Sequence, residues 1–263
     1  MSIVTIFRGS YRQSKEVAEK LANKLGYECI SREMILEAAA KHFDIPEFRL
    51  TRAIDDAPSL LDRLTYGKEK FIAYFREMLM HHLIKDNVVY HGLVGHLFLQ
   101  KVTHVLTVSI LADRKDRLAE EKIRGLSPKE ALAIIEKDDE ALSRWGNFVY
   151  GIDVRDPRLY DLVIRLRFLT TDDAVGLIQS VLEHPCFKTT SESQKAMETW
   201  LHASQVQTVL MKEIPSAKVG VERGEIVVTI GGSWAEGKKL IAKVDQIIDN
   251  ERGVKVKVSL TSP

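Results

Sequence analysis

The chain has 263 residues, of which 38 are lysine or arginine and 37 are aspartate or glutamate, so its formal net charge is +1 at neutral pH. This balance excludes a global field that would attract nucleic acid or an anionic membrane surface, and no apolar run is long enough to span a bilayer. The two cysteines, Cys29 and Cys186, have no metal-ligand spacing, and no charged-then-apolar leader is recognisable. We therefore expect a cytoplasmic protein with reduced, buried thiols, built as one large or two modest domains.

The first predicted unit is a strand, a short loop and a helix. Residues 3–8 are rich in β-branched side chains, and residues 17–22 follow a helical pattern. Between them, Gly9 and Lys15 occupy the outer positions of the phosphate-binding pattern G-x-x-x-x-G-K-[ST], in which backbone N–H groups at a helix N-terminus face an anion. This layout predicts a nucleotide site at residues 9–15.

Two positions of that pattern are altered. Ser14 replaces the second glycine, and Glu16 stands where the magnesium-binding hydroxyl belongs. Arg12 and Lys15 still supply positive charge, and Ser10 or Ser14 would have to serve as any hydroxyl ligand. On these residues alone two interpretations stay open: a phosphate-binding loop, or an ordinary βα unit in which Lys15 is a first-turn lysine.

Strands and helices alternate as far as residue 183. Further strands are predicted at residues 27–30, 87–92, 105–111 and 160–166. Helices are predicted at residues 31–41, 68–84, 95–100 and 171–183, with another that starts at residue 46. The region 114–145 is also predicted to be helical, with a capping box at residues 127–130. This alternation predicts an α/β fold whose parallel sheet is covered by helices on both faces. Ligands of such sheets bind beyond the carboxyl ends of the strands, where residues 9–15, His91 and Asp113 would converge.

The composition changes after His184, where a polar stretch follows a proline and indicates a linker. Beyond it, the pattern predicts a helix (195–214), two strands (217–222 and 225–230), a second helix (234–250) and a last strand (254–260). This α-β-β-α-β order predicts a small α+β unit with its own core and without a catalytic constellation. The expected division is therefore a first domain at 1–187, a linker at 188–194 and a second domain at 195–263.

The first domain resembles the cytidylate-kinase-like P-loop proteins. Residues 17–26, Val-Ala-Glu-Lys-Leu-Ala-Asn-Lys-Leu-Gly, are similar to the family's I-A-x-x-L-A-x-x-L-G helix, and residues 156–164, with Asp-Pro before Tyr-Asp-Leu-Val-Ile, are similar to its D-P-x-x-Y-D-L-V-I strand entry. The likeness covers roughly residues 1–183. The second domain resembles a BON domain at residues 219–230 and at the Gly-Val pair of 253–254.

The first resemblance implies a P-loop nucleoside-monophosphate-kinase-like fold and phosphoryl transfer from ATP, with Mg²⁺, to a nucleoside monophosphate similar to CMP. It assigns nucleotide binding to the loop and catalysis to a loop lysine and a lid arginine. The implied residues are Lys15 and Arg144 for catalysis, Gly9, Ser10, Arg12, Ser14 and Lys15 for the nucleotide, and Arg32, Asp55, Asp56 and His91 for the substrate.

Several positions depart from the family pattern. The family's Gly-Ser-Gly-Gly loop centre is occupied by residues 11–14, the Gly-Arg motif after the third strand appears as His91-Gly92, and Ala141 or Leu142 takes one lid arginine position. Each lost electrostatic contact to a transition state costs roughly 10²–10³ in rate. The alternatives are therefore a working kinase, a kinase for a different small acceptor, or a catalytically weak or inactive sensor that binds a nucleotide or phosphorylated ligand and signals through the BON-like domain to a protein or small-ligand partner.

Structural roles compete with these functional ones. His91 is either a phosphate contact or a hydrogen-bonded structural histidine. Asp55 and Asp56 are either a substrate-binding pair or a helix cap before Pro58. The spacings of the histidines fit no recognised ligand pattern, so we expect no metal site built from them.

Overall fold

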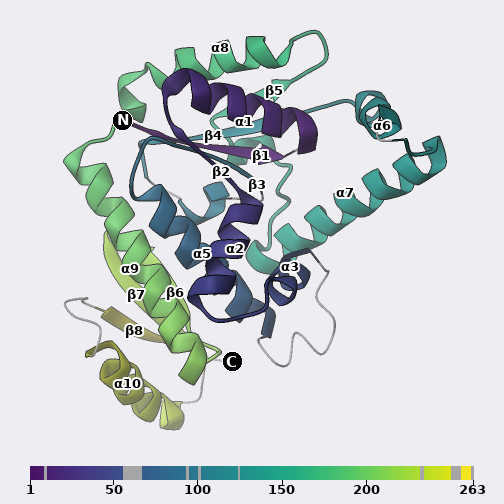
Figure 1. The fold of residues 1–263 in the computed structure, drawn as a ribbon. Helices are drawn as coiled ribbons and strands as arrows, with labels where there is room; N and C mark the ends of the chain where they lie inside the picture. The colour runs from purple at the N-terminus through teal and green to yellow at the C-terminus, as the bar shows by residue number, and fades with distance from the viewer. Residues whose placement is uncertain are drawn as a thin grey trace.

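The structure, a computed structural model, describes residues 1–263 apart from positions 9–10, 56–66, 93–94, 100–101, 124, 232–233, 250–255 and 262–263. Five strands form a parallel sheet in the order β2-β3-β1-β4-β5 (Figure 1). Their bounds are β1 (Ile3–Arg8), β2 (Glu28–Ser31), β3 (Val88–Gly92), β4 (Val105–Leu111) and β5 (Leu162–Arg165). The α/β fold with a parallel sheet is therefore confirmed.

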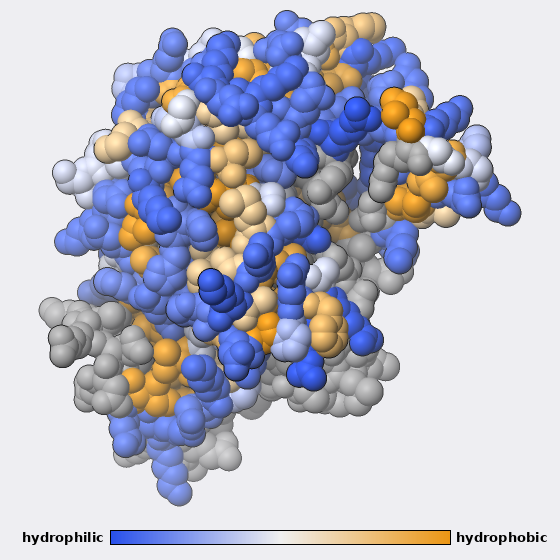
Figure 2. All heavy atoms as spheres, viewed as in Figure 1, coloured by the Kyte–Doolittle hydropathy of each residue, from blue (hydrophilic) through white to orange (hydrophobic). Residues whose placement is uncertain are grey.

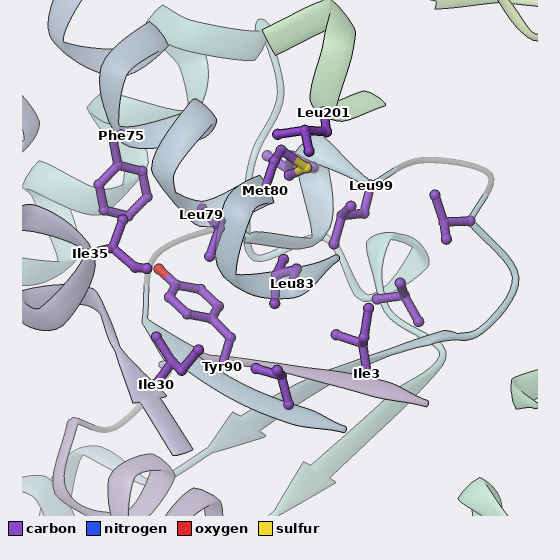
Figure 3. Close-up of a cluster of buried hydrophobic side chains, with 14 of the residues drawn as sticks. Ile3, Ile30, Ile35, Phe75, Leu79, Met80, Leu83, Tyr90, Leu99 and Leu201 are labelled. Atoms are coloured by element: carbon purple, nitrogen blue, oxygen red, sulfur yellow. The ribbon is translucent and has the colours of Figure 1, made fainter. Parts of the chain in front are cut away.

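Helices cover both faces of this sheet, as predicted (Figure 1). One face carries α1 (Tyr11–Leu25) and α8 (Thr171–Leu182), and the other carries α2 (Arg32–His42), α3 (Glu47–Asp55) and α5 (Gly67–Leu83). Strand β1 separates two cores, because Ile3 and Phe7 pack on the α2–α5 side whereas Val4 and Ile6 pack against α1 and α8. Figure 3 shows part of the first of these cores, including Tyr90 of β3.

A pair of helices extends away from the sheet beside its carboxyl edge (Figure 1). These are α6 (Arg114–Ile123) and α7 (Pro128–Tyr150). The predicted capping box of α7 is confirmed: the Ser127 hydroxyl accepts a hydrogen bond from the Glu130 N–H, and the Glu130 carboxylate accepts one from the Ser127 N–H at 2.9 Å. Short 3₁₀ turns connect other elements, namely η1 (Gly95–Phe98), η2 (Pro157–Leu159) and η3 (Pro185–Phe187).

A second, three-stranded sheet forms near the C-terminus. Strands β6 (Lys218–Glu222) and β7 (Glu225–Gly231) are antiparallel, and β8 (Val256–Thr261) lies parallel to β7. Helices α9 (Ser191–Glu213) and α10 (Trp234–Asp249) pack against this sheet through a third apolar core. The predicted α-β-β-α-β order is therefore confirmed.

Helix α9 belongs to two cores at once. Met197 and Leu201, near its start, pack into the core of the parallel sheet beside α5, whereas Val206 and Leu210 pack into the small C-terminal core. The helix begins at Ser191, four residues before the predicted start, because Thr190 caps its first turn. The expected domain division at residues 187 and 195 stays a prediction.

The surface in Figure 2 is largely hydrophilic, with small hydrophobic patches. No described helix is long and apolar enough to cross a bilayer. One expectation about the thiols was wrong: both cysteines are free, but Cys186 is exposed and only Cys29 is partly buried. Burial raises the pKa of the Cys29 thiol to about 11, so this side chain is a neutral apolar group at physiological pH.

Candidate functional site

The carboxyl edge of the parallel sheet brings together several of the residues singled out in the sequence. In the sheet register, His91 of β3 lies between Ile6 of β1 and Ser31 of β2. Arg32 follows Ser31 directly, and α1 begins three residues after β1 ends. Arg32, His91 and the N-terminus of α1 are therefore positioned at one end of neighbouring strands, the edge at which open α/β sheets bind ligands.

Helix α1 begins earlier than the loop pattern predicts. The helix starts at Tyr11, so Arg12, Ser14 and Lys15 are helical residues, and the expected seven-residue loop at 9–15 is shortened. A helical start is physically reasonable because residues 11–14 contain no glycine that would favour a left-handed loop. The N–H groups of the first turn have no intrahelical partners and carry the positive end of the helix dipole. Gly9 and Ser10 lie outside the described residues.

Lys15 is placed on the side of this helix. Its ammonium lies 3.7 Å from the Glu19 carboxylate, one turn further along, and both side chains are about half exposed (47% and 52%). Such exposed pairs contribute little, so the ammonium remains accessible to a more strongly charged ligand. Arg12, in the first turn, is also exposed.

Ser14 differs from its neighbours because it is completely buried (0% exposed). It shares the inward stripe of α1 with Val17, Ala18 and Leu21, and its hydroxyl has no hydrogen-bond partner. A buried hydroxyl without a partner is uncommon and costs free energy. This side chain cannot meet a ligand on the solvent side without a local movement.

Glu16 does not occupy a vacant ligand position, because it links α1 to α8. Its carboxylate accepts a hydrogen bond from the Thr171 hydroxyl at 2.7 Å and lies 3.0 Å from the Lys20 ammonium. Lys20 in turn lies 2.9 Å from Asp172. The Thr171 and Lys20 hydrogen bonds hold the pKa of Glu16 below its ordinary value.

Arg32 is held close to the backbone at the end of β3. A Cβ atom on Gly92 would lie 2.6 Å from the Tyr90 hydroxyl and 2.9 Å from the Arg32 Cβ. Only glycine fits there, which lets Arg32 (8% exposed) and His91 (5% exposed) approach this end of the sheet. The Arg32 guanidinium also lies 3.3 Å from Glu33.

The helical pair α6–α7 contains ion pairs of its own. Arg117 donates to both carboxylate oxygens of Asp139, at 2.8 and 3.0 Å, and Arg114 pairs with Glu136. The backbone of Arg144 lies in α7, but its side chain is outside the described residues. Arg114 and Arg117 of α6 therefore bind acidic residues of α7 and hold the two helices together.

The predicted acidic substrate residues are only partly described. Asp55 is the last residue of α3, with an undescribed side chain, and Asp56 lies outside the described residues. Their substrate role stays a prediction, as do the roles of the other site residues.

The structure adds an ion pair that the sequence analysis missed. Asp113 follows β4, and Arg165 ends the adjacent strand β5; the Arg165 guanidinium binds the Asp113 carboxylate at 2.5 and 2.8 Å. The signal available in the sequence was that both residues follow neighbouring parallel strands and therefore reach the same edge.

Comparison with known protein families identifies the chain. A model of the cytidylate kinase-like family matches residues 3–167, which are 165 of the 263 residues. The chain belongs to this family. No curated protein sequence matches it significantly.

Solved structures share the fold at low sequence identity. An uncharacterized protein from Eubacterium ventriosum is 20% identical, has a TM-score of 0.53, and the match covers 70% of this chain and 99% of that one. A shikimate kinase from Bacteroides thetaiotaomicron (15% identity, TM-score 0.43, 70% and 100% covered) and a dephospho-CoA kinase from Campylobacter jejuni (16%, 0.36, 69% and 97%) are more distant. At such identities the first likeness shows a common fold only, and the other two carry no argument.

The Mg²⁺ that the cytidylate kinase-like resemblance implies can be tested against the oxygen donors of this edge. Mg²⁺ prefers carboxylate and other oxygen ligands. Here Glu16 is engaged by Thr171 and Lys20, Asp113 by Arg165, and the Ser14 hydroxyl is buried beneath α1. Across the described residues, no group of three histidine, cysteine or acidic side chains could hold a metal. Mg²⁺ usually keeps several waters and binds through one or two protein oxygens and the phosphates of a nucleotide, so it needs no such group, and the expected Mg²⁺ stays a prediction.

Proposed function

We propose that this cytidylate kinase-like protein binds a nucleotide at the carboxyl edge of its parallel sheet and transfers a phosphoryl group from ATP to a nucleoside monophosphate similar to CMP. The supporting observation is the convergence of the α1 N-terminus with Arg32 and His91 at that edge. In the reaction, an oxygen of the acceptor phosphate attacks the γ-phosphorus, and the bond from that phosphorus to the bridging oxygen of ADP breaks.

The roles follow from charge and position. The first-turn N–H groups of α1, with Arg12 and Lys15, would hold the donor phosphates, since helix N-termini and cations both favour anions. Arg32 and His91 would contact the acceptor phosphate, with Asp55 and Asp56 on the acceptor side. Arg144 would neutralise the transferring group, and positioning and electrostatic stabilisation would supply most of the catalysis.

Calorimetric titration tests this proposal. ATP and CMP are titrated separately and together into the full chain, and ADP formation is then followed with a panel of nucleoside monophosphates. We expect binding of ATP that CMP strengthens, together with ADP formation that requires the acceptor. Lys15→Ala should weaken ATP binding about tenfold through loss of a charge-assisted contact, whereas Lys24→Ala, at the far end of α1, serves as the matched control. Unchanged ATP affinity in a folded Lys15→Ala variant would remove Lys15 from the site.

A second candidate is binding without transfer. It is favoured by the early start of α1, which places Lys15 beside Glu19, and by the ion pairs that occupy Arg114 and Arg117. Such a sensor would bind a nucleotide or phosphorylated ligand and signal through the C-terminal unit. Tight ATP binding without ADP formation, for every acceptor tried, would favour this candidate over the kinase.

Two further proposals concern the C-terminal unit and the location of the protein in the cell. The resemblance of residues 195–263 to a BON domain suggests that this unit binds a protein or small-ligand partner. The charge balance and the reduced thiols support a cytoplasmic location.

A further inference from the structure

Hydrogen bonds at the amino edge of the parallel sheet attach the start of α9 to the sheet (Figure 1). Thr189, two residues before α9 begins, donates its N–H to the Met1 carbonyl at 3.0 Å. Its hydroxyl lies 2.8 Å from the same oxygen and is also hydrogen-bonded to the Asp86 carboxylate. Asp86, in the turn before β3, accepts a further bond from the Asn87 N–H at 3.0 Å. These contacts of residues 1, 86–87 and 189 form an amino-edge network that joins three distant segments of the chain.

His104 is a buried, titratable residue beside this network. It lies in the turn before β4 and is fully enclosed (0% exposed), and neither nitrogen of its ring has a hydrogen-bond partner among the described residues. Its backbone carbonyl accepts the Ile3 N–H at 3.0 Å, so the residue is fixed at the start of β1. Two charged groups act on the ring from the neighbouring segments, namely the Asp86 carboxylate and the N-terminal ammonium of Met1. The ring is therefore enclosed next to the carboxylate that binds Thr189.

An imidazole in this position is stable only in its neutral form. The charged ring has two N–H donors and a positive charge, and burying these groups without acceptors costs more free energy than burying the neutral ring. Burial therefore lowers the pKa of His104 from its ordinary value of 6.5; the Asp86 carboxylate opposes this effect and the Met1 ammonium adds to it. Below about pH 6.5, a state in which the ring reaches water binds a proton more readily than the closed state, so the closed state loses stability as the pH falls.

We propose that protonation of His104 opens the amino-edge network and releases the segment before α9, so that the attachment of the C-terminal unit to the parallel sheet depends on pH. The charged ring requires an acceptor, and Asp86 is the carboxylate that already attracts it. A ring that binds Asp86 competes with the Thr189 hydroxyl for the same carboxylate. The residues of the network lie outside the helices and strands, so the network can open while the cores stay packed.

The experiment is amide hydrogen exchange of the full chain, measured by mass spectrometry at about pH 7.5 and about pH 5.5 and corrected for the intrinsic exchange rate. If the ring has its ordinary pKa in the open state, the opening constant of the peptide that contains Thr189 should rise about tenfold over this interval, and that of α8 should not change. His104→Gln replaces the ring by a side chain that does not titrate and should abolish the rise. His202→Gln changes an exposed histidine of α9 and serves as the matched control, which should keep the rise.

Three results would overturn the proposal. The first is equal exchange of the Thr189 peptide at the two pH values in the wild type. The second is a rise that persists in His104→Gln, because another group would then be responsible. The third is a rise of the same size in α8, because acid would then unfold the parallel-sheet domain as a whole rather than open the network. If His104→Gln does not fold, His104→Phe takes its place in the same comparison, since it fills the space of the ring without a polar atom.

Discussion

Gly146 provides a quantitative test of how α7 is attached to the rest of the protein. A Cβ atom at this helical position would lie 2.4 Å from Val154 Cγ1 and 3.0 Å from the Ile152 carbonyl oxygen. Val154 is fully buried, so it cannot move into solvent to make room. Overpacking of this kind costs about 1–3 kcal/mol, and the close approach to a buried side chain and to backbone places the cost toward the upper end. The higher helix propensity of alanine offsets about 1 kcal/mol of this cost. We therefore expect Gly146→Ala to lower the free energy of unfolding by about 1–2 kcal/mol.

Gly176 in α8 is the matched control, because an added Cβ there has no heavy atom within 4 Å. Gly176→Ala should therefore benefit from the higher helix propensity of alanine without any steric cost, and raise the free energy of unfolding by about 0.5–1 kcal/mol. Urea unfolding followed by circular dichroism measures both variants under the same conditions. If Gly146→Ala were as stable as Gly176→Ala, the close packing of α7 on residues 152–154 would be refuted.

Three further changes test other contacts. Ser14→Ala should raise the free energy of unfolding by about 1 kcal/mol in urea unfolding, since it removes a buried hydroxyl that has no partner; a loss of stability would reveal a hidden hydrogen bond. The folded-state pKa of Glu16 is lowered by Thr171 and Lys20, so its contribution is complete above about pH 4.5 and disappears as the pH falls through the folded pKa. Glu16→Gln should therefore lower Tm at neutral pH and converge with the wild type in acid; parallel pH profiles would contradict this. Thr170→Ala removes the capping box of α8 and should cost about 1 kcal/mol in urea unfolding, whereas an unchanged midpoint would show that the cap is dispensable.

Local patterns in the sequence predicted most of the fold. The apolar run of β4 and the capping box at Ser127 depend on residues that are adjacent in the chain, so they could be recognised without tertiary information. The start of α1 was placed incorrectly because the loop was interpreted through a glycine-rich template, whereas residues 11–14 are compatible with a helix.

Contacts between distant segments could not be predicted in the same way. Arg165 meets Asp113 across 52 positions, and Thr171 meets Glu16 across 155. The first pair arises from the order of the strands and the second from the packing of α1 on α8. The periodicity of a single segment predicts neither the strand order nor the helix packing. They change the interpretation of the site, because the carboxylates of Glu16 and Asp113 are bound to other side chains.

The shared helix α9 has a consequence for how the chain unfolds. Its 23 residues extend about 34 Å, and its two halves supply buried side chains to two separate cores. Melting either core would deprive half of the helix of its packing, and an isolated half of about 12 residues is only marginally helical in water. The two cores should therefore lose structure together, as one cooperative unit with a single calorimetric transition, although the chain contains two sheets that share no strand.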